Sequence, residues 1–373
     1  MAETEQTLTT EVDARAAKQP TARQPRKLVE IIISQLAALH TYHRAVLDTE
    51  AVEAIHKMRV TTRRLQASLD LLEREMKVRK LKRRLRNWRR RLSTVRNYDV
   101  FLELIEKETP SRGRARREQL ELVKAILKER RLHRAAKVRQ FLEDIDIDAM
   151  AIRLGLSKPS TSEATYTAGV HDDAHNRAPT VEATTETMEL DERSVAGYAA
   201  ERLDQRLEEF QALAAQSHPT NNPAELHQLR IAAKRVRYLL EIVSEMGYGD
   251  ASRALAWLRT LQDRIGDWHD LEALEEEIIA IVSSNEFMKQ HLAESGRMLQ
   301  AAAHLQKKKE ALVSRLFPVR VPKTLELTVR RIARALRHGF VQSRAQQRAR
   351  TLLRQRKNPT PSEFDNQTKD VQV

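Results

Sequence analysis

Two stretches of the sequence place a histidine and several cationic side chains at the same spacing. The first stretch, from Ile55 to Met76, contains His56, Arg59, Arg63 and Arg64. At 100° per residue, His56, Arg59 and Arg63 fall within about 60° of one another on one helical face. Guanidinium and imidazole groups together offer positive charge and hydrogen-bond donors. Such a face is suited to binding phosphoryl oxygens.

The same arrangement returns between Leu226 and Val243. His227, Arg230, Lys234 and Arg235 take the places of the first four residues, all at one constant offset along the chain. In both stretches apolar residues gather on the opposite helical face: Met58, Leu65 and Leu69 in the first, and Leu229, Val236 and Leu240 in the second. A spacing repeated over this many positions predicts an internal duplication of helical units.

Catalysis is one alternative to anion binding for His56 and His227. A phosphohistidine nucleophile needs an Arg-His-Gly-type loop and an acid partner, and neither surrounds these two histidines in the sequence. A buried structural histidine is a second alternative. We favour hydrogen-bond donors to phosphoryl oxygens, and we expect no catalytic residue and no enzymatic activity.

The densest basic stretch follows directly, from Lys77 to Arg96. It lacks the glutamates four residues away that would neutralise a structural face, and like charges at that spacing destabilise a helix slightly. Most charge runs are solvated helix faces, which is the alternative, but an anionic partner accounts better for charges of one sign. The candidate ligands in this stretch are Lys82, Arg86, Arg89, Arg90 and Arg96.

The matching stretch of the second half is much less basic. A short insertion shifts the register here, so that Arg86 is aligned with Arg259 and keeps a cationic partner. In this register, Leu255, Gln262 and Asp263 stand where the first half has Lys82, Arg89 and Arg90. Arg259 and Tyr238 complete the set of candidate ligands. We therefore expect the first half to carry more of the binding energy.

Composition agrees with a polyanionic partner. The chain has 66 Lys and Arg against 52 Asp and Glu, a net charge of +14, which favours association with anions. Few aromatic residues and only 9 glycines favour an all-helical fold. The absence of cysteine excludes disulfides and thiolate ligands, which fits the cytoplasm. The longest apolar run, Leu28 to Leu39, is too short to span a bilayer, so we expect no membrane segment and, from the polar first residues, no signal peptide.

The pattern divides the chain into five parts. We expect a disordered leader over residues 1–25, a first helical half over 26–142, a disordered linker over 143–191, a second helical half over 192–320, and a basic helical extension with a loose tail over 321–373. Two interpretations of the extension stay open: its arginines extend an anion-binding surface, or Leu327, Ile332, Ala335 and Phe340 pack it against the domain.

One pair of histidines has a spacing that could hold a metal. His40 and His43 lie three residues apart near the end of the first helix, but no third ligand is within reach in the sequence. We favour a solvated helix end there and expect no metal and no cofactor.

The doubled pattern H-x-x-R-x-x-x-[RK]-R resembles the CHAD family, the conserved-histidine α-helical domain. The segments VRNYDVFLELI, from Val95 to Ile105, and WHDLEALEEEI, from Trp268 to Ile278, are similar to the helix junction of that family in each half. The resemblance covers about Lys27 to Phe317. It implies an all-α fold of two four-helix repeats, related by a pseudo-two-fold axis around a basic central groove or pore that binds inorganic polyphosphate.

We therefore expect a non-catalytic, cytoplasmic protein that binds inorganic polyphosphate on polyphosphate granules, with polyphosphate-metabolising enzymes as further partners. The alternative is a basic helical protein that binds nucleic acid or ribosomes. Trp88 and Tyr238 are the aromatic residues interleaved with the basic faces, and Trp88 falls on the apolar side. Platforms on which bases could stack are thus few, which makes nucleic acid the secondary partner.

Overall fold

The structure is a computed structural model that describes residues 27–49, 51–108, 114–156, 190–217 and 223–338. Over these ranges the chain forms helices and no strand, which confirms the predicted all-α fold. The predicted leader, most of the predicted linker and the predicted tail lie outside the described residues.

The first half begins with four helices in which each packs on the next. These are α2 (Leu28–Thr49), α3 (Val52–Leu71), α4 (Arg79–Glu108) and α5 (Arg114–Glu143), followed by the short α6 (Asp148–Arg153). Apolar residues at helical spacing explain the packing, because Ile32 and Leu36 of α2 and Leu65 of α3 are almost fully buried. Burying each such side chain contributes about 1.5–3 kcal/mol.

The second half repeats this order of contacts. Its helices are α7 (Glu192–Gln216), α8 (Pro223–Glu245), α9 (Ser252–Val282), α10 (Asn285–Gln290), α11 (Leu292–Leu316) and α12 (Lys323–His338). In this half α7 packs on α8, α8 on α9, and α9 on α11.

The helix boundaries follow the sequence repeat. The first residues of α3 and α8 are separated by the same offset as His56 and His227. The first residues of α4 and α9 are separated by the same offset as Arg86 and Arg259. The starts of α8 and α9 thus follow those of α3 and α4 at the same offsets as the repeated sequence pattern.

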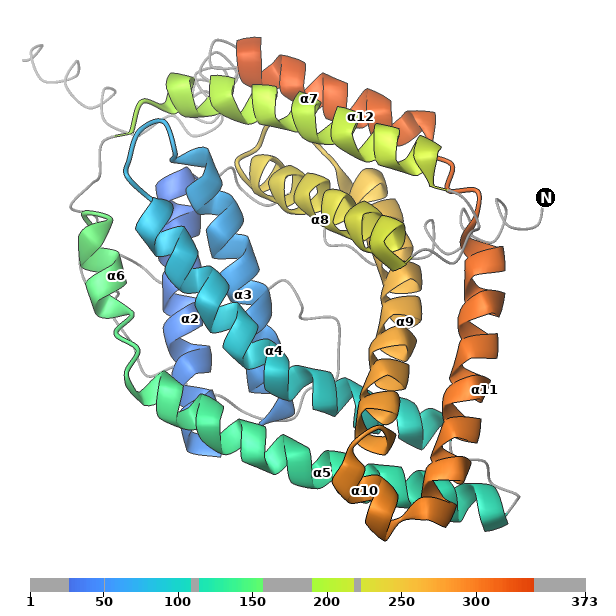
Figure 1. Ribbon diagram of the computed structural model, residues 1–373. Coiled ribbons are helices and arrows are strands. Elements are labelled where there is room, and N and C mark those ends of the chain that lie inside the picture. Colours follow the sequence, from blue (N-terminus) through green and yellow to red (C-terminus); the bar gives the residue numbers. More distant parts are fainter. Residues whose placement is uncertain (1–26, 50, 109–113, 157–189, 218–222, 339–373) are drawn as a thin grey trace, which may run out of the picture.

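The two halves face each other across the molecule. In Figure 1, α2, α3 and α4 lie on one side and α8 and α9 on the other, with α7 and α12 across one end and α5 across the opposite end. Contacts between the halves join α3 to α8, α4 to α9 and α5 to α11. The faces of α3 and α8 that carry the repeated motif are thereby brought close together.

The helix junctions expected from the sequence do not form in α4 and α9. Both run without interruption through the segments that resemble a helix junction, Val95 to Ile105 and Trp268 to Ile278. Gly266 lies inside α9 and is not among the described glycines with a positive φ. A single glycine inside a helix costs only about 1 kcal/mol relative to alanine, so burial of the flanking apolar residues outweighs it.

Helix α6 corrects the predicted linker, which was expected to be disordered from residue 143. Residues up to 156 are ordered, and Ile147, Met150, Ala151 and Leu154 are buried in the main core. The last three lie three, four and seven residues after Ile147, which places all four on one face of a helix. The surrounding serines, threonines and acidic residues concealed this short period in the sequence.

Helix α12 packs against α7, as the packing interpretation expected, but partly through other residues. Leu325, Val329, Ile332, Ala333 and Leu336 are buried on one face. Leu327, expected on that face, is 67% exposed because it lies two positions from Leu325 and so points away from α7. Ile332 is placed as predicted, and Phe340 lies outside the described residues.

Candidate anion-binding site

The repeated motif delivers four cationic side chains to the contact between α3 and α8. Arg59 and Arg63 come from α3, and Arg230 and Lys234 come from α8. The opposite faces of both helices are anchored in the core, because Met58, Leu65, Leu229 and Val236 are almost fully buried. The amphipathic pattern therefore fixes the direction in which the cations point.

Further cations join these four from α4 and α8. Arg96 lowers the pKa of Arg59, and Arg63 lowers the pKa of Arg89. Arg237 contacts Tyr238 through a side-chain hydrogen bond. We call the following set the cationic cluster: Arg59, Arg63, Arg89, Arg96, Arg230, Lys234 and Arg237.

Burial and mutual repulsion disfavour the charges of Arg59, Arg230 and Lys234. Burial, reinforced by Arg63, Arg96 and Arg230, lowers the pKa of Arg59 to about 9. Burial, Arg63 and Arg230 lower the pKa of Lys234 well below its usual value. The pKa of Arg230 is lowered by burial and by Arg63, although Asp270 opposes the change. Like charges held out of water in this way destabilise the unliganded protein.

Three Nε atoms in the cluster are shielded from solvent and lack a hydrogen-bond partner within the described part of the chain. One belongs to Arg237 and lies 3.8 Å from a carboxylate oxygen of Glu241, and the other two belong to Arg59 and Arg230. Buried polar atoms are paired in most proteins, and leaving one unpaired costs about 1–3 kcal/mol. Arg59 and Arg230 occupy corresponding positions of the two sequence motifs. The arrangement is suited to an anion that bridges the repeats and accepts hydrogen bonds from both.

Carboxylates and a phenol hold part of the cluster in place. Glu241 forms ion pairs with Arg64 at 3.8 Å, with Arg237 at 3.8 Å and with Arg259 at 3.3 Å. Burial opposes ionisation of Glu241, but these arginines together lower its pKa. Arg63 is hydrogen-bonded to Tyr238, and the guanidinium of Arg237 lies 4.6 Å from the centre of the Tyr238 ring.

The remaining predicted ligands differ in how they are engaged. Lys82 forms ion pairs with Asp70 and Glu73, Arg235 bonds to Glu209 at 2.7 Å, Arg96 bonds to Glu103 at 2.9 Å, and Arg89 donates to Gln66 Oε1 at 2.8 Å. Arg86, Arg90 and His227 are exposed, and His56 is half-buried. Lys82 and Arg235 are thus paired with carboxylates of the protein.

Two residues that lie beside predicted ligands were absent from the sequence prediction. Arg237 lies one turn beyond Lys234, and its nearness to Tyr238 was the signal available in the sequence. His269 lies beside His227, with ring centres 5.8 Å apart. The register that aligns Arg86 with Arg259 places His269 at the position of Arg96. The repeat offset could have identified His269, but the motif itself does not contain it.

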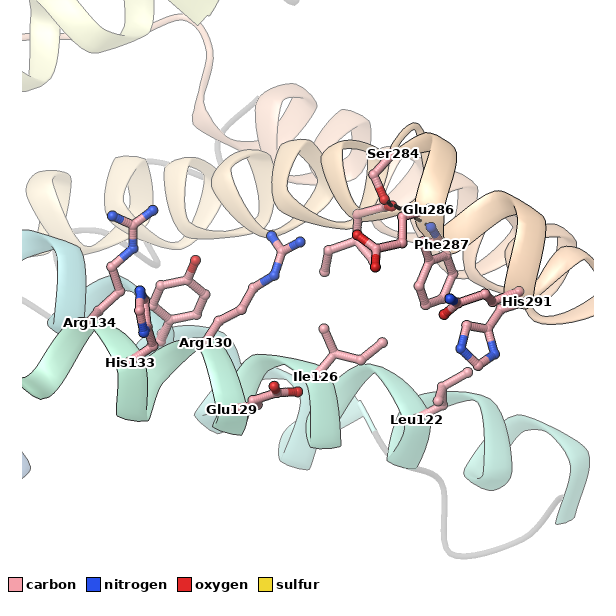
Figure 2. Close-up of a pocket in the computed structure, with 13 residues that line it drawn as sticks. Leu122, Ile126, Glu129, Arg130, His133, Arg134, Ser284, Glu286, Phe287 and His291 are labelled. Atoms are coloured by element: carbon pink, nitrogen blue, oxygen red, sulfur yellow. Dashed lines mark hydrogen bonds between the residues drawn. The ribbon is translucent and has the colours of Figure 1, made fainter.

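A separate pocket of about 520 Å³ lies between α5 and the α10 segment. Figure 2 shows Arg130, His133 and Arg134 extending from α5 toward one end of the pocket, and Phe287 and His291 at the other end. Arg130 is neutralised by Glu277 at 2.6 Å, and Glu277 also accepts a hydrogen bond from Tyr98. None of the predicted ligands lines this pocket, and its mixture of acidic and basic groups does not resemble the cationic cluster.

His43 corrects the expected solvated helix end. It is buried, and its Nε2 lies 2.8 Å from the carbonyl oxygen of Leu142. Burial lowers the pKa of His43, against the effect of this hydrogen bond. Within the described ranges there is no group of three or more histidine, cysteine or acidic residues that could hold a metal. In the same ranges, no helix is both long enough and apolar enough to cross a membrane.

A family model and two solved structures are similar to this chain. The family model described as CHAD domain matches residues 30–278. The crystal structure of the CHAD domain from the plant Ricinus communis has a TM-score of 0.54 and 19% identity, and the match covers 82% of this chain and 96% of that one. PptA from Streptomyces chartreusis has a TM-score of 0.47 and 16% identity, with 78% of this chain and 97% of that chain covered. No curated protein matches the sequence.

Proposed function

Because this chain belongs to the CHAD domain family, we propose that it binds inorganic polyphosphate in a basic groove between its two helical halves. In this proposal the halves are two four-helix repeats related by a pseudo-two-fold axis. The groove is formed by the motif-bearing faces of α3 and α8, with α4 and α9 beside them. The protein catalyses no reaction of its own.

The observation that carries the proposal is the placement of like charges at the contact between the repeats. Arg59, Arg63, Arg230 and Lys234 repel one another, and the Nε atoms of Arg59 and Arg230 have no hydrogen-bond partner in the described part of the chain. A polyanion would reverse both penalties, because it supplies negative charge and acceptor oxygens at the same place. The energetic cost of the repulsion and of the unpaired Nε atoms is explained if the protein functions with a polyanion bound.

Polyphosphate suits this site better than nucleic acid does. It is a flexible chain that carries about one charge per phosphoryl unit and has no bases to accommodate. Guanidinium forks match pairs of phosphoryl oxygens, and successive helical turns space them by about 5.4 Å. The ring of Tyr238 is buried and covered by Arg237, so it offers no free face on which a base could stack.

The proposal extends to where the protein acts. Binding to long polyphosphate would concentrate the protein on cytoplasmic polyphosphate granules, where polyphosphate-metabolising enzymes would be its neighbours. Several cations acting on one polyanion would give affinity largely through counterion release, as for nucleic-acid backbones.

Titration with long-chain polyphosphate tests the proposal, using Arg59→Gln with Arg230→Gln as the variant. Each charge-assisted hydrogen bond contributes about 1.5–3 kcal/mol, so the double variant should lose about a hundredfold or more in affinity. The matched control is Lys80→Gln with Arg84→Gln, which removes the same charge from exposed positions of α4. The control should stay within about threefold at physiological salt, because exposed charges are screened. Equal losses in both variants would refute the groove.

Two further experiments distinguish polyphosphate binding from nucleic-acid binding and from catalysis. Polyphosphate should displace labelled single-stranded RNA, whereas RNA should fail to displace polyphosphate; the reverse result would favour a nucleic-acid-binding protein. Incubation with polyphosphate and Mg²⁺ should leave the chain length unchanged on a gel. Shortening that depends on the protein would refute the assignment as non-catalytic.

A further inference from the structure

The two halves of the cationic cluster differ at one position. The offset between the first residues of α4 and α9 also separates Arg96 from His269. Arg96 acts on Arg59 of the first motif, and His269 interacts with Arg230 of the second motif. The two side chains therefore hold corresponding places next to corresponding arginines. One is a permanent cation, and the other can gain or lose a proton near neutral pH.

The surroundings of His269 are mostly cationic. From α8, His227 lies with its ring centre 5.8 Å away, and Arg230 and Lys234 also act on His269. On α9, the adjacent Asp270 interacts with Arg230, Lys234 and the α4 residue Arg96.

Helix α11 also packs on α9, but the lysine that it presents is already neutralised. Lys309 of α11 forms ion pairs with Glu272 and Glu275 of α9. The charges next to His269 therefore come from α8, from α4, from Asp270, and from Asp267, which acts on Asp270.

We propose that His269 is a further ligand-binding residue of the groove, and that it takes up a proton from solvent when the polyanion binds. The second half of the groove would then bind more tightly as the pH falls, whereas Arg59, Arg63 and Arg96 would keep the first half charged throughout. This inference rests on the proposed function and adds to it a residue and a form of regulation.

The electrostatics of the empty site support this assignment. Burial, Arg230, His227 and Lys234 lower the pKa of His269 to about 4, so its imidazole is neutral in the unliganded protein at neutral pH. A bound polyanion places negative charge among the same groups and favours the imidazolium. By linkage, a group whose pKa rises on binding makes the affinity increase as the pH falls through the bound-state pKa.

The expected size of the effect follows from the two pKa values. If the ligand restores the ordinary histidine pKa of about 6.5, affinity should rise about tenfold between pH 8 and pH 5.5, since the free-state pKa is about 4. A higher bound-state pKa would give a larger increase. Long polyphosphate is the appropriate probe, because its internal phosphoryl groups stay ionised over this range.

The experiment measures polyphosphate affinity from pH 8 to pH 5.5 at fixed ionic strength, for the full chain and three variants. His269→Gln should remove the tenfold increase in affinity between pH 8 and pH 5.5. His269→Arg, which restores the residue of the first repeat, should bind more tightly than wild type at pH 8. His133→Gln is the matched control, because His133 is exposed on α5, and it should behave as wild type.

A direct measurement distinguishes the proposed role of His269 from a purely structural role. The NMR titration of the His269 imidazole should show a pKa that rises when polyphosphate is added, with unchanged circular dichroism. Binding without pH dependence, or a pH dependence that persists in His269→Gln, would overturn this inference while leaving the proposed function intact. Loss of polyphosphate binding at every pH and salt concentration would instead refute the proposed function itself.

Discussion

Replacing Lys234 by methionine should stabilise the unliganded protein and weaken its binding of polyphosphate. Lys234 is largely buried among Arg63, Arg230, Arg237 and Arg59, and each of them lowers its pKa in addition to burial. Methionine has a similar length and removes the charge. The substitution thus relieves both the desolvation of the ammonium group and its repulsion by four neighbours.

The magnitude follows from the degree of burial. Replacing buried charges by apolar residues of similar volume is neutral or stabilising by about 1–4 kcal/mol. Lys234 retains some exposure, so we expect about 1–2 kcal/mol after solvent screening. This corresponds to a Tm increase of about 2–4 °C. The same substitution removes one charge-assisted hydrogen bond to the ligand, about 1.5–3 kcal/mol, and should weaken binding at least tenfold.

The pH dependence provides an internal check. The pKa of Lys234 in the folded protein lies below its unfolded value of about 10.4. The unfolded state therefore binds more protons between these two values, and the stability of wild type rises with pH in that window. Lys234→Met lacks this dependence, so its stability advantage should shrink between pH 7 and pH 10.

Urea unfolding followed by circular dichroism, at pH 7 and pH 10, measures these differences. Lys307→Met is the control, because Lys307 is exposed on α11 and its replacement makes the same change in charge. The control should change neither stability nor affinity appreciably. If Lys234→Met is destabilised at pH 7, the lysine is paired rather than repelled, and the reasoning about the cluster is wrong.

Three other measurements address the ligand and the core. The logarithm of polyphosphate affinity should fall linearly with the logarithm of salt concentration, with a slope of several units; a flat dependence in a titration series would exclude an extended groove. Arg86→Glu with Arg90→Glu should weaken binding more than Arg253→Glu with Arg259→Glu, because Arg259 is already paired with Glu241; equal losses in calorimetry would remove the difference between the halves. Met150→Ala should lower the free energy of unfolding by about 2–5 kcal/mol, because Met150 is fully buried in α6; a wild-type urea midpoint would show that α6 does not belong to the core.

Much of the fold and part of the site could be predicted from the sequence. Apolar residues at helical spacing predicted the helices, and the constant offset between the motifs of His56 and His227 predicted that α3 and α8 are equivalent. These predictions depend on local periodicity, which the order of residues expresses directly. The motif also contains Arg59 and Arg230, which the structure brings close enough to act on each other electrostatically.

Local periodicity was insufficient where several helices contribute to one environment. The short apolar face of α6 was hidden in a polar segment, and its burial depends on contacts with the main core. The helix junctions expected near Val95 and Trp268 do not form, because packing along α4 and α9 overrides the signals of a break. Such effects are set by tertiary contacts, which outweigh weak local preferences.

Only the tertiary structure determines how strongly each charge of the site is stabilised or destabilised. Lys82 and Arg235 belong to predicted ligand positions, yet carboxylates from outside their own helices form ion pairs with them. Arg59 and Lys234, from opposite halves, lie in one like-charged cluster only because α3 packs against α8. A sequence determines which residues carry charge and on which helical face they lie. The energy of each charge depends on burial and on neighbours distant along the chain, and only the folded arrangement of the helices determines these.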